Sequence, residues 1–354
     1  MSTFKVARLT GPRQFELVDW EMPELRPDEV RVKILATAIC TSERGVYTGE
    51  RAGTYPAYMG HEISGIVEEV GSEVVNDIKP GDHVSVSRIN RCHECVNCRT
   101  YTDNRCLNSR KLHRPGRQPG PGGFSEYLIV PAYQVFKFTA PVDKVAASLT
   151  EPVACCVSSV DKANITFGDD VLVVGAGVMG LIHVTLARLK GARVIVSEVN
   201  RDRHELAREF GADEVIDPTE GLAEQIMDLT HGKGLDAVLV TGGPQSIVPG
   251  LIEVCRQGAP VVLYTSYHGA MRDEAEIDLN KIHYSEVNLV GTVSPKKYDF
   301  YRAVKLVSDG RFKLDKLVEA VYPFEQIQEA FEHGIRPGAY RVVLDIGLGI
   351  KRQL

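Results

Sequence analysis

The chain has 354 residues, of which 44% are hydrophobic and 25% are charged, a composition typical of globular domains. At roughly 150 residues per domain, this length predicts two domains. The net charge of −6 argues against nucleic acid or an anionic membrane as a partner. Residues 1–15 contain no apolar run of signal-peptide length, and the most apolar window, residues 171–184, is broken by three glycines and a histidine. It falls short of the ~20 apolar residues of a membrane span. We therefore expect no membrane segment and a cytoplasmic location.

Cysteine is the unusual component, with eight residues. Four of them lie between Cys92 and Cys106. A reducing compartment disfavours a disulfide framework, so these thiols are expected to have another role.

The first 150 residues are predicted to be rich in β-structure. Segments such as residues 29–35 and 65–70 alternate or run apolar over strand lengths, with Gly and Pro between them.

From about residue 171 the pattern changes to short apolar strands that alternate with helical stretches, among them residues 179–190 and 202–210. This alternation predicts a doubly wound parallel sheet, so the fold class is α/β plus β. We place the end of this domain near residues 291–294. A helix around residues 298–308 follows, and a strand at residues 341–346 is expected to return to the first domain.

A glycine-rich turn follows the first of these strands, in the order Gly175-Ala-Gly177-Val-Met-Gly180. In a dinucleotide site the first glycine makes the tight turn, the second admits the pyrophosphate, and the third lets the helix pack on the strand. The helix N-terminus offers free N–H groups to the phosphates. The turn therefore predicts a nicotinamide dinucleotide site.

Glu198 lies 23 residues after Gly175, near the ~20 expected for the carboxylate that binds the adenosine ribose. A carboxylate there would repel a 2′-phosphate, which favours NAD over NADP, although Arg201 and Arg203 could pair with a phosphate. The alternative is that Glu198 sits on a solvated strand end. The candidate cofactor-binding residues are Gly175, Gly177, Val178, Met179, Gly180, Glu198 and Arg203. For Met179 the alternative is that it packs in the core and does not contact the cofactor.

The four clustered cysteines are Cys92, Cys95, Cys98 and Cys106. Four thiolates at these spacings satisfy a tetrahedral zinc ion and leave no open position, which predicts a structural site. An iron–sulfur cluster and disulfides are the alternatives. His93 is expected at the surface.

A second set of possible ligands lies outside the cluster: Cys40, the triplet Gly60-His61-Glu62, and Glu151. One thiolate, one imidazole and one or two carboxylates leave a position open for substrate, as a catalytic zinc ion requires. Each of these residues alone would more often be structural.

The chain resembles the zinc-dependent medium-chain alcohol dehydrogenases, most closely the polyol (sorbitol) and L-threonine dehydrogenase branch. The resemblance covers the whole chain through seven motifs in order: Cys40 with Ser42, residues 60–62, 81–84, the four-cysteine lobe, 122–127, 151–152, and the turn from Gly175.

This resemblance implies a GroES-like catalytic domain at residues 1–150 and 295–354, with a structural zinc lobe at about 91–107. A Rossmann NAD-binding domain at 151–294 is inserted into it. The family also implies a small-molecule substrate and a homodimer or homotetramer, for which the strand run from Ala259 is a candidate contact edge.

Carried over residue by residue, the resemblance places the catalytic zinc on Cys40 and His61, with Glu62 as a third ligand or close neighbour. Glu151 stands where alcohol dehydrogenases proper have a cysteine, as in the polyol and threonine branch. Two zinc ions per chain are thus expected. Asp82 is either a neighbour of the ligands or a turn residue.

In the mechanism that the family implies, zinc lowers the pKa of the substrate hydroxyl, hydride passes to the nicotinamide, and Ser42 passes the proton onward. Glu43 replaces the usual aspartate. Gly45 stands where many members have a proton-relaying histidine, so the proton must leave through water, a ribose hydroxyl or another residue.

The segment 105–117 is rich in cations, including Arg110 and Arg114. We consider that some of them recognise a phosphorylated, acidic or heavily hydroxylated substrate, with a solvated loop as the alternative and His113 as a possible proton acceptor. The predicted reaction is oxidation of a secondary alcohol of a polyol, cyclitol or sugar derivative. L-Threonine oxidation and a non-catalytic binding protein are the alternatives.

Overall fold

The computed structural model describes residues 2–51, 53–112 and 114–347. The chain divides into two units, one formed by Met1–Ala154 with Pro295–Leu354 and the other by Cys155–Ser294. The first division falls within helix α4 (Thr150–Lys162), four residues after the boundary expected from the sequence. Each unit is described separately.

The first unit is built around a seven-stranded sheet in the order β14-β15-β3-β4-β5-β7, with β6 also paired to β3. Only β14 and β15 run parallel. The strands are β3 (Glu29–Ala38), β4 (Glu62–Val70), β5 (His83–Val86), β6 (Tyr127–Pro131), β7 (Val135–Lys137), β14 (Val318–Pro323) and β15 (Arg341–Asp345). A separate hairpin consists of β1 (Thr3–Gly11) and β2 (Gln14–Glu21).

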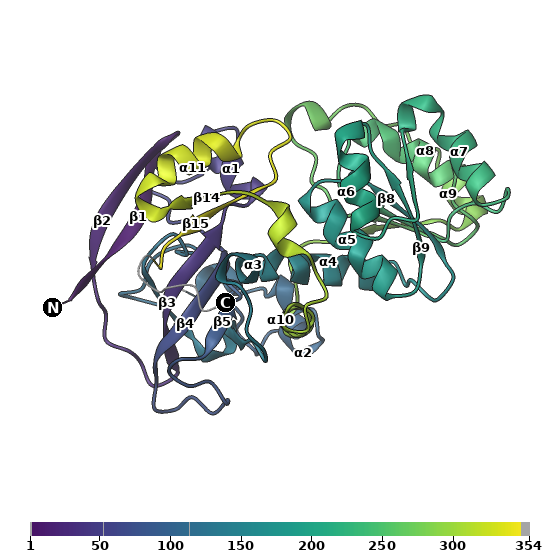
Figure 1. Ribbon diagram of the computed structural model, residues 1–354. Coiled ribbons are helices and arrows are strands. Elements are labelled where there is room, and N and C mark those ends of the chain that lie inside the picture. Colours follow the sequence, from purple (N-terminus) through teal and green to yellow (C-terminus); the bar gives the residue numbers. More distant parts are fainter. Residues whose placement is uncertain (1, 52, 113, 348–354) are drawn as a thin grey trace. The chain divides into compact units, whose positions relative to one another are not determined.

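Both ends of the chain contribute to this unit, as Figure 1 shows with the purple β3 beside the yellow β15. The predicted return of the last strand is confirmed, because Val343 of β15 lies opposite Ala38 of β3. The helices of the unit are α1 (Thr41–Thr48), α2 (Val96–Arg99), α3 (Lys144–Ser148), the start of α4, α10 (Lys297–Ser308) and α11 (Ile327–Gly334). Its core joins buried side chains such as Ile34 of β3, Ile63 of β4 and Phe331 of α11.

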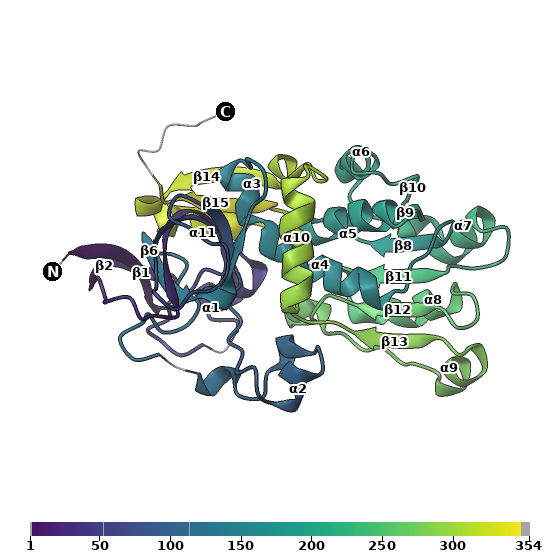
Figure 2. The same ribbon diagram turned by 90° about the horizontal axis from the view of Figure 1, so that it is seen from below.

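The second unit is a six-stranded, wholly parallel sheet in the order β10-β9-β8-β11-β12-β13 (Figure 2). Its strands are β8 (Asp170–Val174), β9 (Arg193–Ser197), β10 (Glu214–Ile216), β11 (Ala237–Val240), β12 (Pro260–Leu263) and β13 (Asn288–Gly291). Its helices, besides the rest of α4, are α5 (Val178–Leu189), α6 (His204–Glu209), α7 (Leu222–Leu229), α8 (Val248–Glu253) and α9 (Leu279–Ser285). The order of strands reverses between β8 and β11, where doubly wound sheets bind their ligands.

One expectation about this sheet is wrong. The strand run from Ala259 is β12, which pairs with β11 on one side and β13 on the other. The two outer strands of this sheet are β10 and β13. β13, next to β12, is four residues long and half-exposed. Among the described residues, no helix is both long and apolar enough to cross a membrane.

Candidate metal and cofactor sites

The first candidate site lies at neighbouring ends of two paired strands. Ala38 at the end of β3 lies opposite Glu62 at the start of β4. Cys40 follows β3 as the N-cap residue of α1, and His61 directly precedes β4. Antiparallel pairing therefore brings ligand atoms of Cys40, His61 and Glu62 within 4.8 Å of one another.

Glu43 holds two of these residues in place. Its Oε2 accepts the Cys40 N–H at 3.0 Å, and its Oε1 accepts the Gly60 N–H at 2.7 Å and lies 2.9 Å from Nδ1 of His61. A carboxylate on Nδ1 fixes the ring so that Nε2 is the nitrogen available to a metal. The sequence analysis noted Glu43 only as a replacement for aspartate, since a contact across 18 positions leaves no local signal.

The charges of the site favour a cation. Burial lowers the pKa of His61, but the negative charges of Glu43 and Cys40 outweigh burial and raise this pKa well above its ordinary value. A negative environment that attracts a proton to the imidazole attracts a divalent metal for the same reason.

The carboxylate of Glu62 is the clearest indication of a missing ligand at this site. Its side chain is fully buried, and its Oε1 accepts a hydrogen bond from Nη2 of Arg341 at 2.6 Å. Its Oε2 is buried without a hydrogen-bond partner among the described residues. A buried hydrogen-bond acceptor without a partner lowers the stability of the fold. A thiolate, an imidazole and a carboxylate oxygen form a donor set that fits zinc.

Two other residues predicted to act at this site, Glu151 and Ser42, belong to the same unit. Glu151 is partly buried in the first turn of α4 and is not part of the group of described ligand atoms that lie within 4.8 Å of one another. Ser42 is the second residue of α1, partly buried and two positions after Cys40. Asp82 is a turn residue, because its carboxylate accepts the Lys79 N–H at 2.7 Å and pairs with Lys137 at 2.9 Å.

The second candidate site is formed by Cys92, Cys95, Cys98 and Cys106, whose sulfur atoms also lie within 4.8 Å of one another. All eight cysteines of the chain are free thiols, so the disulfide alternative is wrong. The N–H of Cys95 donates to the sulfur of Cys92 at 3.3 Å, as does Nδ2 of Asn108 at 3.4 Å. Hydrogen bonds from the N–H groups of Cys95 and Glu94 and from Asn108 lower the pKa of Cys92 to about 6. The thiolate is the form that binds metal.

A buried ion pair within the cysteine lobe is hydrogen-bonded to the chain that re-enters the first unit. Arg91 is almost fully buried, donates to the carbonyl of Pro295 at 3.1 Å, and lies 3.3 Å from Asp103. Asp103, between Cys98 and Cys106, accepts the N–H of Lys297 at the start of α10. His93 is exposed, as expected, with its Nδ1 3.3 Å from Nζ of Lys297.

Two cations of the basic segment 105–117, Arg114 and Arg117, form structural ion pairs. Arg114 pairs with Asp28 at 2.6 Å and Glu29 at 3.0 Å, and Arg117 pairs with Glu29 at 2.5 Å. Glu29 is fully buried at the start of β3. The hypothesis that this segment recognises substrate is therefore wrong for Arg114, while Arg110 is exposed and His113 lies outside the described residues.

We expect Arg117→Met to destabilise the fold by about 3 kcal/mol, because it leaves a buried carboxylate short of its partner. Burial raises the pKa of Glu29, but hydrogen bonds from Arg117, the Arg26 N–H and Arg114 outweigh it and hold this pKa below its ordinary value. A lowered pKa contributes stability above the unfolded-state pKa and loses it as the pH falls through the folded-state pKa. The difference between wild type and variant should therefore shrink in acid.

Urea unfolding at several pH values measures this effect, with Arg110→Met as the exposed control. An unchanged free energy of unfolding combined with a raised substrate KM in Arg117→Met would restore the recognition hypothesis.

The glycine-rich turn joins β8 to α5 at the point where the strand order reverses. Gly175 adopts φ +94°, and a Cβ on Gly180 would lie 1.9 Å from the carbonyl oxygen of Gly175. A Cβ on Gly177, the N-cap residue of α5, would meet nothing within 4 Å. The turn and the packing thus require the outer two glycines, and open space lies above the middle one.

Glu198 is buried, not a solvated strand end. It follows β9, its Oε2 accepts the Ala176 N–H at 2.7 Å, and its Oε1 accepts the Asn200 N–H at 2.8 Å. Arg203 lies 3.9 Å from this carboxylate, and Arg201 pairs with Asp217 and Glu220. Val178 is buried and Met179 half-buried in the first turn of α5. Carboxylates therefore engage both arginines that could have bound a 2′-phosphate.

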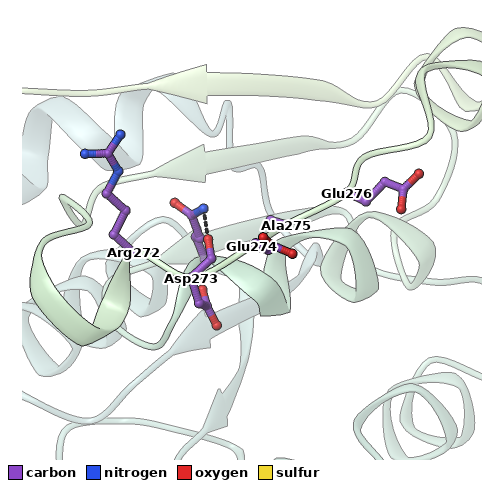
Figure 3. Close-up of a pocket in the computed structure, with 6 residues that line it drawn as sticks. Arg272, Asp273, Glu274, Ala275 and Glu276 are labelled. Atoms are coloured by element: carbon purple, nitrogen blue, oxygen red, sulfur yellow. Dashed lines mark hydrogen bonds between the residues drawn. The ribbon is translucent and has the colours of Figure 1, made fainter.

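An open cavity of about 570 Å³ in the second unit involves none of the residues singled out from the sequence. Figure 3 shows its wall from Arg272 to Glu276, with a hydrogen bond from the side chain of Gln245 to the carbonyl of Asp273. Three carboxylates on one exposed loop do not define a binding site.

Comparison with known proteins gives the family. The model of the alcohol dehydrogenase GroES-like domain matches residues 26–140, and the model of the zinc-binding dehydrogenase matches residues 178–309. The chain is 34% identical to L-threonine 3-dehydrogenase of Pyrococcus horikoshii, over 90% of this chain and 91% of the relative. It is 28% identical to D-arabitol-phosphate dehydrogenase of Enterococcus avium, over 95% of each.

Among solved structures, a protein assigned as a zinc-binding dehydrogenase from Sinorhizobium meliloti 1021, bound to NADP, superposes with a TM-score of 0.85. It is 30% identical and covers 98% of this chain and 100% of its own. The fold and the donor groups define a zinc-binding oxidoreductase of the alcohol dehydrogenase class. The chain belongs to the zinc-binding medium-chain alcohol dehydrogenase family, with a GroES-like and a Rossmann domain, and is an NAD(P)-dependent enzyme that acts on a small-molecule alcohol.

Proposed function

We propose that the enzyme transfers a hydride from a secondary alcohol of a polyol, cyclitol or sugar derivative to NAD, with a catalytic zinc ion held by Cys40, His61 and Glu62. Two observations carry the proposal: a carboxylate oxygen of Glu62 lies within 4.8 Å of a thiol and an imidazole, and Oε2 of this buried side chain has no hydrogen-bond partner among the described residues. The arabitol-phosphate relative supports the polyol class. Glu151, at the start of α4, is proposed as an exchangeable carboxylate near this ion.

The residues of the first unit have separate tasks in this reaction. Bound zinc supplies a Lewis acid that lowers the pKa of the substrate hydroxyl, and bound NAD accepts the hydride. Glu43 fixes the His61 tautomer, and Arg341 holds Oε1 of Glu62, which leaves Oε2 without a hydrogen-bond partner among the described residues. Ser42 takes the hydroxyl proton. With Gly45 in place of a histidine, the proton then leaves through water or a ribose hydroxyl.

For the cofactor we propose NAD, bound at Gly175, Gly177, Val178, Met179 and Gly180. Support comes from the Glu198 carboxylate at the end of β9 and from the engagement of Arg201 and Arg203 in ion pairs. The NADP in the Sinorhizobium structure belongs to that protein. Comparing kcat/KM with NAD and with NADP tests the proposal, and a preference for NADP would contradict it.

The second and third glycines of the turn, Gly177 and Gly180, give separate predictions. Gly180→Ala should destabilise the fold by about 1–3 kcal/mol, because its Cβ would overlap the carbonyl of Gly175. Gly177→Ala should leave stability within about 0.5 kcal/mol, since φ is −77° and the Cβ enters open space. It should nevertheless weaken NADH binding about tenfold or more, because that space is where a pyrophosphate would approach.

Thermal unfolding and NADH fluorescence titration of both variants measure these effects. Normal NADH affinity in Gly177→Ala would place the pyrophosphate elsewhere.

A spectrophotometric screen of NAD reduction tests the substrate class. The panel contains polyols, inositols, their phosphates, sugar acids and L-threonine. We expect the strongest turnover with a polyol, a cyclitol or one of their derivatives. L-Threonine as the best substrate would select the alternative suggested by the 34% identical relative, and no turnover of any alcohol by zinc-loaded protein would favour a non-catalytic role.

Three further expectations belong to this proposal. The Cys92, Cys95, Cys98 and Cys106 group is proposed to hold a second, structural zinc ion. A homodimer or homotetramer is proposed, with β13, at the edge of its sheet, as the contact in place of β12. The cytoplasmic location also stays a prediction.

A further inference from the structure

Arg341 connects strand β15 to the candidate metal site. It is the first residue of β15, and its Nη2 donates to Oε1 of Glu62 at 2.6 Å. Both side chains are buried. Glu62 supplies one of the ligand atoms that lie close to Cys40 and His61. The groups that hold the backbone at Arg341 therefore also help to set the position of a candidate metal ligand.

The preceding residue, Tyr340, is held at both of its backbone groups by side chains from other elements. Its N–H donates to Oε2 of Glu319 at 2.7 Å, and its carbonyl accepts a hydrogen bond from Nη2 of Arg44 at 3.1 Å. Glu319 belongs to β14, and Arg44 belongs to α1, the helix whose N-cap residue is Cys40. These two contacts join three elements at the residue that leads into Arg341.

The pairing of β14 with β15 explains how Glu319 reaches this backbone. Val318 and Ala320 lie opposite two consecutive residues of β15, so the register shifts at Glu319 between them. A β-bulge leaves its extra residue out of the ladder and can redirect its side chain. Here the redirected carboxylate accepts the N–H directly before β15.

A histidine fixes the other oxygen of the Glu319 carboxylate. The hydrogen bonds from His333 and from the Tyr340 N–H lower the pKa of Glu319 against the effect of burial, so this group is ionised at neutral pH. Nε2 of His333, on α11, lies 2.8 Å from Oε1 of Glu319 and donates to it, because an ionised carboxylate only accepts. Nδ1 of His333 lies 3.0 Å from the hydroxyl of Tyr322. Each oxygen of Glu319 thus has its own partner, which fixes the side chain in one orientation.

We propose that Glu319 is a positioning residue for the candidate metal site. It holds the backbone of Tyr340 and so fixes where Arg341 begins β15, and Arg341 in turn holds Glu62. The inference rests on the proposed function, because that function assigns Glu62 to a metal ion. The side chain of Glu319 is 36% exposed, so its truncation opens no buried cavity and should change global stability little.

Hydrogen exchange of the full-length protein tests the first link, from Glu319 to Tyr340. Glu319→Ala should speed exchange of the Tyr340 amide about threefold to tenfold, the equivalent of one hydrogen bond. Glu319→Gln keeps an acceptor oxygen for this amide and should stay close to wild type. Glu325→Ala, which removes an exposed carboxylate nearby in the chain, is the control. Unchanged exchange in Glu319→Ala would overturn the proposal.

Zinc release to a chelator tests the second link, from Tyr340 to the metal site. Glu319→Ala should release zinc from the Cys40 group about threefold to tenfold faster, less than the 10–100-fold typical of a residue bonded directly to a ligand. The zinc of the four-cysteine lobe should leave at the wild-type rate, and Cys40→Ser identifies which ion is which. Adding Glu319→Ala to Arg341→Gln should cause no further change in release, because both residues act on the same carboxylate.

The remaining outcomes separate this inference from the proposed function. Faster exchange at Tyr340 with a wild-type rate of zinc release would show that Glu319 only supports the strand, and would overturn its role at the metal site. Equally faster release of both ions with a lowered unfolding temperature would show a general loss of stability, and would overturn it too. A wild-type protein without zinc at the Cys40 group would contradict the proposed function itself, and the role of Glu319 with it.

Discussion

Cys40→Ser is expected to lower kcat/KM by about 10³-fold or more, because loss of the thiolate removes the metal that stabilises the developing alkoxide charge. The unfolding temperature should change little, since Cys40 is the N-cap residue of α1 in a capping box with Glu43, and serine is itself a favoured N-cap residue. Steady-state rates with the best substrate of the panel, together with thermal unfolding, measure both quantities.

Glu43 provides a graded control for this prediction. Glu43→Gln should lower activity or zinc affinity about 10–100-fold, because it loosens His61 without removing a ligand. Glu43→Asp, the residue common in the family, should retain more activity than Glu43→Gln. Near-normal activity of folded Cys40→Ser would show that the reaction does not use this group of residues.

Cys106→Ser is expected to have the second large effect, on stability. Structural zinc binding is worth ~10 kcal/mol or more in small zinc domains, and loss of one thiolate should unfold the cysteine lobe. The links from Arg91 and Asp103 to Pro295 and Lys297 should then be lost with it. Each kcal/mol lowers the unfolding temperature by roughly 2–4 °C in a domain of this size, so a fall of at least 10 °C is expected.

Cys255→Ser is the matched control, because its sulfur donates to the carbonyl of Leu251 at 3.1 Å and a hydroxyl can do the same. Its unfolding temperature should stay within a few degrees of wild type. A Cys106→Ser protein that melts like wild type, with or without a chelator, would speak against a structural metal in the lobe.

The sequence predicts the second unit well because its signals are local. Short apolar strands alternating with helices predict a doubly wound sheet. Gly175 adopts a positive φ, and Gly180 has no room for a Cβ. Which strand lies at the edge of a sheet is not a local property. Residues 260–263 and 288–291 both form short strands, and only the pairing shows that β13, not β12, lies at that edge of the sheet.

The candidate metal site is likewise only partly predictable from the sequence. The ligand types of Cys40, His61 and Glu62 are visible in the sequence, but the residues that orient them are not. Arg341 lies 279 positions from Glu62, and no spacing rule links them. For the same reason the partners of Arg114, which lie 85 and 86 positions away, could not be foreseen, and its charge suggested substrate recognition instead.

The zinc content of the purified protein tests the central claim most directly. Elemental analysis should find two zinc ions per chain in the wild type, one in Cys40→Ser with unchanged thermal stability, and one in Cys106→Ser with retained occupancy at the Cys40 group in any folded fraction. A wild-type chain that binds a single zinc ion, and keeps it after Cys40→Ser, would contradict the assignment of a catalytic metal to Cys40, His61 and Glu62.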